Sequence, residues 1–212
     1  MLNLTRWQTL WRNLKGSSNP APVFDQLQAL YAEPHRAYHN LDHIADCLAQ
    51  FDRAGHLAVY PAELELAIWL HDIIYDTHAS DNEGKSAQWA VDAMHAAHMT
   101  PEAIKRVETL ILATKHTTAP KEPDAQLLVD IDLSILGRPP REFDAYEAKI
   151  RQEYAWVLEE AFRQGRRAIL ESFLARPSIY QTSFFREQFE AQARENLARS
   201  MISLSQIPPL YK

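Results

Sequence analysis

The stretch PAELELAIWLHDIIY, residues 61–75, says most about the fold of this chain. Pro61 is typical of the first turn of a helix, and the residues after it are apolar around most of a helical circumference. A helix that is apolar on all sides is buried, so the sequence predicts a central helix here. His71 and Asp72 lie within that predicted helix, where an uncompensated charge is strongly destabilising.

Helices are predicted on both sides of this stretch, and no segment alternates as a strand would. Only five glycines occur among the 212 residues, and strong helix formers are abundant. Asn40 and Thr100 are typical N-caps, and Gly165 is the expected bend of a long C-terminal helix. The fold class is therefore all-α, with helices predicted over about 4–15, 22–32, 40–53, 61–75, 82–98, 101–114, 124–136, 141–175 and 183–204.

The chain length fits a single domain, which we expect to span residues 1–212. Pro139 and Pro140 form a break between a predicted core over about 22–137 and a helical layer over about 140–212. The connection at this break is too short and apolar to indicate independent domains.

Charge and cysteine content exclude several classes of function. The net charge is −6 and no basic block is present, which argues against nucleic acid as a partner. Cys47 is the single cysteine, so an intramolecular disulfide and a thiolate metal cluster are both excluded. A lone cysteine fits a reducing cytoplasm, where we expect the protein to act.

No membrane association is expected. The sequence has no run of about 18 apolar residues, and MLNLTRWQTLWRNLKG lacks the apolar stretch of a signal peptide. Trp7, Leu10, Trp11 and Leu14 form a helical stripe that fits either an interfacial membrane helix or docking onto the core; we favour docking. Aromatic residues in the terminal helices leave a homodimer open, although core packing explains them equally well.

Metal-seeking residues recur along the first two-thirds of the chain. His39 and His43 are four residues apart, a spacing that places both on one side of a helix beginning near His39. Asp130 and Asp132 are two apart and face nearly opposite directions, so one of them at most is expected to reach a metal. Hydrophobicity alone leaves open which one does.

The order of these residues resembles the HD superfamily of metal-dependent phosphohydrolases. YHNLDHIADCL (38–48) and DLS (132–134) are similar to segments of the cyclic-nucleotide phosphodiesterases, which are distant members. YHNLDHI, LHDIIYD followed by DNEGKSA (81–87), and RENLARS also resemble a bacterial family of predicted HD-domain phosphohydrolases along nearly the whole chain. The resemblance implies a compact bundle of about eight to ten helices.

The resemblance also implies roles for individual residues. It assigns His43, His71, Asp72 and Asp132 as metal ligands, which selects Asp132 over Asp130. It assigns His39 as the proton donor to the leaving oxygen. Ile73-Ile74-Tyr75 stands where the phosphodiesterases carry a further histidine, so their substrate preference does not transfer.

Mixed imidazole and carboxylate ligation suits Mn, Fe, Co, Ni or Zn better than Mg²⁺. One ion or two are both open, with Mg²⁺ an option for the second. Glu83 is a candidate general base, against the simpler interpretation that it complements a helix dipole. His116, Arg36 and Lys115 are candidate contacts for a substrate phosphate, and His116 is alternatively a candidate ligand of a second metal.

We therefore expect a metal-dependent phosphohydrolase acting on a small phosphorylated metabolite or nucleotide. Two alternatives remain: a non-catalytic nucleotide-sensing module and, less favoured, a di-iron oxygenase. The oxygenase needs further imidazole ligands, for which His95, His98 and His116 are available. Otherwise His95 and His98, like His56 and His78, are expected at the surface.

Overall fold

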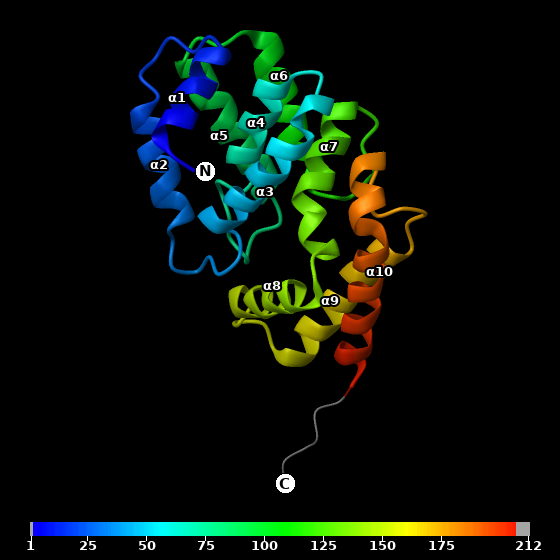
Figure 1. The fold of residues 1–212 in the computed structure, drawn as a ribbon. Helices are drawn as coiled ribbons and strands as arrows, with labels where there is room; N and C mark the ends of the chain where they lie inside the picture. The colour runs from blue at the N-terminus through cyan, green and yellow to red at the C-terminus, as the bar shows by residue number, and fades with distance from the viewer. Residues whose placement is uncertain (1, 207–212) are drawn as a thin grey trace. The chain divides into compact units, whose positions relative to one another are not determined.

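The computed structural model describes residues 2–206, which form helices and connecting loops without any strand (Figure 1). The all-α prediction is confirmed. The α-helices and the short 3₁₀ helices, labelled η, are α1 (Leu4–Asn13), α2 (Ala21–Tyr31), α3 (Leu41–Ala54), η1 (Gly55–Leu57), α4 (Pro61–Leu70), α5 (Asn82–Ala96), α6 (Pro101–Ala113), α7 (Pro123–Asp132), η2 (Leu133–Gly137), α8 (Pro140–Glu153), α9 (Glu159–Leu174) and α10 (Ser183–Ser205).

The helices group into two compact units. The first unit extends to Asp132 and holds α1 to α7, and the second begins at Leu133 and holds η2 and α8 to α10. The division lies at the end of α7, a few residues before the predicted break at Pro139 and Pro140. The expectation of a single domain over residues 1–212 stays a prediction.

Helix α4 is the centre of the first unit, as predicted. It contacts α1, α3, α5, α6 and α7 (Figure 1). Ala67, Ile68, Trp69 and Leu70 are completely buried. Glu63, the buried carboxylate near its start, is neutralised by Arg106 of α6 at 2.5 Å. The apolar circumference of this helix therefore predicts its position correctly.

The prediction that this helix continues through Tyr75 was wrong, because α4 ends at Leu70. The amide of Ile73 donates to the carbonyl of Leu70, a three-residue spacing that tightens and ends the helix. The segment that follows finds its hydrogen bonds elsewhere: the Ser86 hydroxyl bonds both the amide and the carbonyl of Ile74. His71 and Asp72 consequently lie at the end of the central helix and not inside it.

Residues 141–175 form two helices, and the break between them is not at Gly165, which lies within α9. The chain turns at Tyr154–Leu158 instead. The Arg151 guanidinium donates to the carbonyls of Tyr154 and Val157, which stabilises this turn. A bend set by an arginine three residues upstream leaves no glycine or proline signal in the sequence.

The aromatic stripe of α1 docks onto the core, in agreement with the favoured interpretation. Trp7 is fully buried and contacts Trp11, Phe24 and Trp69, with ring centroids 5.3, 6.2 and 5.4 Å away. No helix within residues 2–206 combines the length and apolar character needed to cross a membrane.

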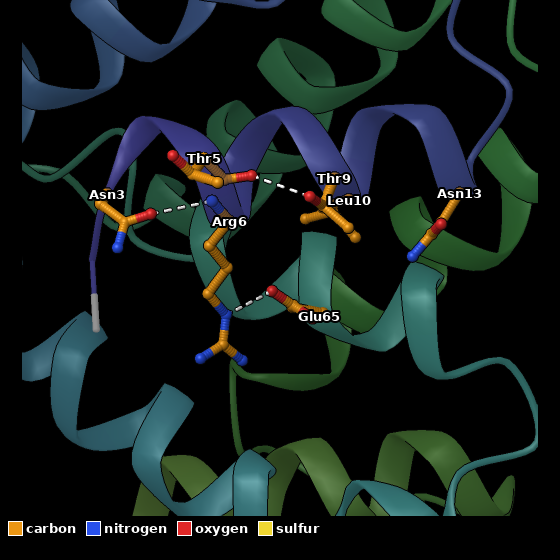
Figure 2. Close-up of a pocket in the computed structure, with 7 residues that line it drawn as sticks. All are labelled: Asn3, Thr5, Arg6, Thr9, Leu10, Asn13 and Glu65. Carbon is orange, nitrogen blue, oxygen red and sulfur yellow. Dashed lines mark hydrogen bonds and ion pairs between the residues drawn. The ribbon is translucent and has the colours of Figure 1, made fainter.

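Ion pairs of Arg6 also attach α1 to the neighbouring helices. Arg6 donates to Glu65 of α4 at 2.7 Å, as Figure 2 shows, and to Asp52 of α3 at 2.7 Å. These contacts border a pocket lined by Asn3, Thr5, Arg6, Thr9, Leu10, Asn13 and Glu65, none of which is a predicted site residue (Figure 2).

In the second unit, η2 packs closely against α10. The buried Asn196 amide donates to the carbonyls of Leu136 and Arg138, both at 2.8 Å. A Cβ added at Gly137 would lie 2.7 Å from the carbonyl oxygen of Phe189, so only glycine permits this approach.

Replacing Trp7 with alanine tests the docking of α1. We expect a loss of about 3–5 kcal/mol in the free energy of unfolding, since a fully buried ring and its aromatic contacts are removed. The matched control is Trp156→Ala, because Trp156 is 53% exposed; its effect should be within about 0.5 kcal/mol. Chemical denaturation measures the free energy of unfolding of both variants, and equal losses in the two would contradict the docking of α1.

Candidate metal site

His43 projects from the first turns of α3, and a well-formed cap sets the start of that helix. The Asn40 side chain accepts from the amide of Asp42 at 2.9 Å, as expected of an N-cap. The same side chain donates to the carbonyl of Ala37, which ties the preceding turn to the helix. His43 is therefore presented by an ordered helix end, and its ring is buried.

His71 is held by the last turn of α4. Its Nδ1 lies 3.0 Å from the carbonyl oxygen of Ile68, so Nδ1 carries the proton and donates it. In the neutral ring, Nε2 then has an unshared electron pair, which is the arrangement that metal-binding histidines adopt. The early end of α4 lets the neighbouring Asp72 turn its carboxylate toward the same point.

Four side chains converge at that point. The Nε2 atoms of His43 and His71 are 3.2 Å apart. Asp72 Oδ2 lies 3.5 Å from the first and 3.1 Å from the second. Asp132 Oδ1, at the end of α7, lies 3.2 Å from His43 and 3.6 Å from His71.

These separations fit a metal ion. With metal–ligand bonds of about 2.1 Å, neighbouring ligand atoms lie about 3.0 Å apart at right angles and about 3.4 Å apart at tetrahedral angles. The group formed by His43, His71 and Asp132 can hold a metal ion. Asp72 adds a carboxylate oxygen within reach of both imidazoles.

Electrostatics also favour a cation here. With its Nδ1 proton donated to Ile68, a neutral His71 directs the unshared pair of Nε2 at His43 and at two negative carboxylates. A proton or a metal ion among these groups relieves the arrangement. The imidazoles are almost fully buried, at 2% and 1% side-chain exposure, whereas Asp72 and Asp132 keep 17% and 15%. The carboxylates are therefore the less buried side of the site.

Protons can take the place of the metal in part. Burial by itself lowers the pKa of His43, but Cys47, Tyr38 and hydrogen bonds to Asp132 outweigh it and raise that pKa well above its usual value. Burial likewise opposes the effect of Asp72 and Asp132 on His71, whose pKa is also raised. The imidazoles in turn hold the pKa of each carboxylate well below its usual range, against the opposing effect of burial.

The structure separates Asp132 from Asp130. Asp132 belongs to the metal-holding group, whereas Asp130 is fully buried in α7 and is not part of it. The second oxygen of Asp132 lies 2.8 Å from Nε2 of His116. His116 follows α6 with a positive φ of 56°, a conformation that histidine tolerates better than most residues. Its contact to Asp132 can orient that carboxylate, and the predicted contact of His116 with a phosphate or a second metal stays a prediction.

His39 lies beside the metal-holding group but outside α3, which begins at Leu41. Its ring centroid is 5.9 Å from that of His43. It stacks on the Tyr75 ring at 4.2 Å. Stacking on Tyr75, and not helical register, therefore sets its place.

Arg36 does not face an open site, in contrast to its predicted role. Its side chain is only 1% exposed. Its guanidinium donates to the carboxylate of Glu33 and to the carbonyls of His39, Asp72 and Ile73. This arrangement supports a structural role.

Glu83 and Lys115 remain candidates. Glu83 lies in the first turn of α5, on the helix face shared with the buried Ser86 and Ala87. Lys115 is exposed just after α6. The contact of Glu83 or Lys115 with a substrate stays a prediction. The other histidines expected at the surface are exposed: His56, His78, His95 and His98.

Two contacts of the site, those of Tyr75 with His39 and of Cys47 with His43, were not predicted from the sequence. Tyr75 was part of a quoted motif, but no periodicity indicates that it stacks on His39. Cys47, one turn after His43, lies 3.8 Å from both ring nitrogens of that histidine. The spacing of four between these residues was the available signal for this contact.

No family model, curated protein or solved structure matches this chain.

We predict opposite pH dependences of stability without and with metal. In chelator, the raised histidine pKa values contribute stability that is complete below about pH 6.5 and is lost as the pH rises through the raised values. The lowered carboxylate pKa values contribute stability that is present above about pH 4 and is lost on acidification. Stability should thus peak between these limits.

Added Mn²⁺ or Zn²⁺ should reverse the slope above about pH 6.5, because protons and metal compete for the same nitrogens. Denaturant unfolding at a series of pH values, in chelator and in metal, measures both profiles. Superimposable profiles would contradict a metal site at these residues.

Proposed function

We propose that this protein is a metal-dependent phosphohydrolase that acts on a small phosphorylated metabolite or nucleotide. One observation carries the proposal: nitrogens of His43 and His71 and oxygens of Asp72 and Asp132 converge at distances that suit metal ligands. The resemblance of the surrounding motifs to the HD superfamily supports the same chemistry. The single cysteine supports action in a reducing cytoplasm.

The mixture of nitrogen and oxygen ligands limits which metals are expected to bind. Two imidazoles and two carboxylates suit Mn, Fe, Co, Ni or Zn better than Mg²⁺. When bound, such an ion lowers the pKa of a water molecule toward neutrality and offsets negative charge on phosphoryl oxygens. The partly exposed carboxylates leave a side from which a phosphate ester can approach.

The protein's own residues supply the proton transfers of the proposed reaction. His39 lies against both His43 and Tyr75, at the edge of the metal-holding group. As an imidazolium, it would donate a proton to the oxygen that leaves the phosphate. Glu83, on the inward face of the first turn of α5, would orient the attacking water. Lys115, exposed beside His116, would pair with phosphate charge.

A non-catalytic nucleotide-sensing module is the second candidate. It is favoured by the ion pairs that the buried imidazoles form with Asp72 and Asp132 when they carry protons, since these satisfy the site without a metal. A di-iron oxygenase gains no support. His95 and His98 are exposed, and His116 is committed to Asp132.

Asp72→Ala tests the proposal. We expect the variant to lose metal retention and to fall to background in hydrolysis of phosphate monoesters and nucleotides, since a charged ligand is removed. The matched control is Asp81→Ala, because Asp81 is an exposed aspartate that pairs with Lys85. Elemental analysis of each purified variant is combined with phosphate release in the presence of each candidate metal.

Full metal content and full activity in Asp72→Ala would refute the assignment of this ligand. Metal-loaded wild-type protein that binds nucleotides without releasing phosphate would favour the sensing module instead.

A further inference from the structure

The buried guanidinium of Arg36 connects two segments at the site: the one that precedes α3 and the turn that follows α4. One segment, before α3, contributes His39, whose carbonyl accepts from Nη1 at 3.1 Å. The other is the turn after α4, where the carbonyl of Asp72 accepts from Nη1 at 2.7 Å and that of Ile73 from Nη2 at 2.9 Å. The Glu33 carboxylate, three residues earlier in the chain, accepts from Nε at 3.0 Å and anchors the arginine side chain.

The hydrogen bonds of Arg36 lie just after the C-terminus of α4, where backbone carbonyls lack partners within the helix. The last carbonyls of a helix, and those just beyond, have no amide partner within the helix and carry partial negative charge. At the end of α4, Tyr31 donates to the carbonyl of Trp69 and His71 to that of Ile68. The carbonyl of Leu70 accepts from the amide of Ile73, and Arg36 satisfies the carbonyls of Asp72 and Ile73 further along the turn, where its positive charge complements the helix dipole.

We propose that Arg36 is a positioning residue for the metal site, acting through the backbone of Asp72. By holding the Asp72 carbonyl, it ends α4 at Leu70 and directs the Asp72 carboxylate toward the imidazoles of His43 and His71. The inference rests on the metal site of the proposed function, and it assigns Arg36 no contact with substrate.

The chemistry of the guanidinium suits this role. It is planar and presents several donors in fixed directions, whereas a lysine ammonium cannot reach two adjacent carbonyls and a third segment at once. The rings of Tyr31 and Tyr75 lie 5.1 and 5.6 Å from the guanidinium carbon, within the range of cation–π attraction. With 1% of the side chain exposed, a free phosphate has no access to it.

Arg194 in the second unit offers a matched control. Its guanidinium donates to the carboxylate of Glu190 and to three backbone carbonyls, those of Leu174, Arg176 and Pro177. The pattern is the same as that of Arg36, but none of these carbonyls belongs to a metal-ligand residue. Comparing the two arginines therefore distinguishes the general effect of losing hydrogen bonds to backbone carbonyls from a specific effect on the position of Asp72.

The test compares Arg36→Lys with Arg194→Lys in the full chain. Metal affinity is measured by competition with a chromophoric chelator, and the visible spectrum of the Co²⁺ protein reports ligand geometry. We expect Arg36→Lys to lose about 10–100-fold in affinity and to change the Co²⁺ spectrum, as loss of a ligand-orienting contact does. Arg194→Lys should keep the affinity within about twofold and leave the spectrum unchanged.

Equal metal affinity in the wild type and Arg36→Lys would overturn this inference and leave the metal site intact. A wild-type protein that binds no metal would overturn both the inference and the proposed function.

Should Arg36→Lys fail to fold, Glu33→Ala decides. The Glu33 side chain is 37% exposed, so its loss removes little burial, but it takes away the carboxylate that fixes Nε of Arg36 and so holds the guanidinium against the carbonyls of Asp72 and Ile73. A measurable fall in affinity supports the role of Arg36, and an unchanged affinity overturns it.

Discussion

The imidazole nitrogens of His43 and His71 lie 3.2 Å apart among buried apolar helices, with the carboxylate of Asp72 beside them and that of Asp132 at the end of α7. This arrangement is unfavourable unless a positive charge sits among the four groups, because acceptors would otherwise face acceptors in a poorly solvated space. A metal ion satisfies all of them together, whereas protons satisfy them in separate pairs. We therefore expect the stability of the first unit to depend on which positive charge occupies this place.

The fold brings the two imidazoles and two carboxylates together because the ends of three helices meet at the site. α4 stops at Leu70 and α7 at Asp132, while α3 begins just before His43. Side chains at helix ends are freer to converge than side chains along parallel helix faces, and the free carbonyls there can be bound by donors such as Arg36. The apolar burial of α4 supplies the rigidity that a precise ligand geometry needs.

Sequence reasoning reached the composition of the site more easily than its geometry. The all-apolar surface of α4 predicts its burial, and the N-cap chemistry of Asn40 and Thr100 predicts two helix starts, because both signals are local. The motif resemblance selected Asp132 over Asp130, which periodicity could not do.

The errors arise from contacts between residues distant in sequence. α4 ends early because Arg36 and Ser86 satisfy the backbone after it, and neither residue is visible in a local window. The break between α8 and α9 likewise depends on the Arg151 side chain and not on Gly165. The carbonyl contacts of Arg36 were missed for the same reason: an arginine that contacts a phosphate is indistinguishable, in sequence, from one that binds carbonyls.

The most direct measurement is anomalous X-ray diffraction from crystals of the protein grown with Mn²⁺ or Zn²⁺. The account predicts one strong anomalous peak about 2.0–2.3 Å from Nε2 of His43 and His71 and from carboxylate oxygens of Asp72 and Asp132. The absence of a peak at these four residues, with the metal bound elsewhere or not at all, would contradict it.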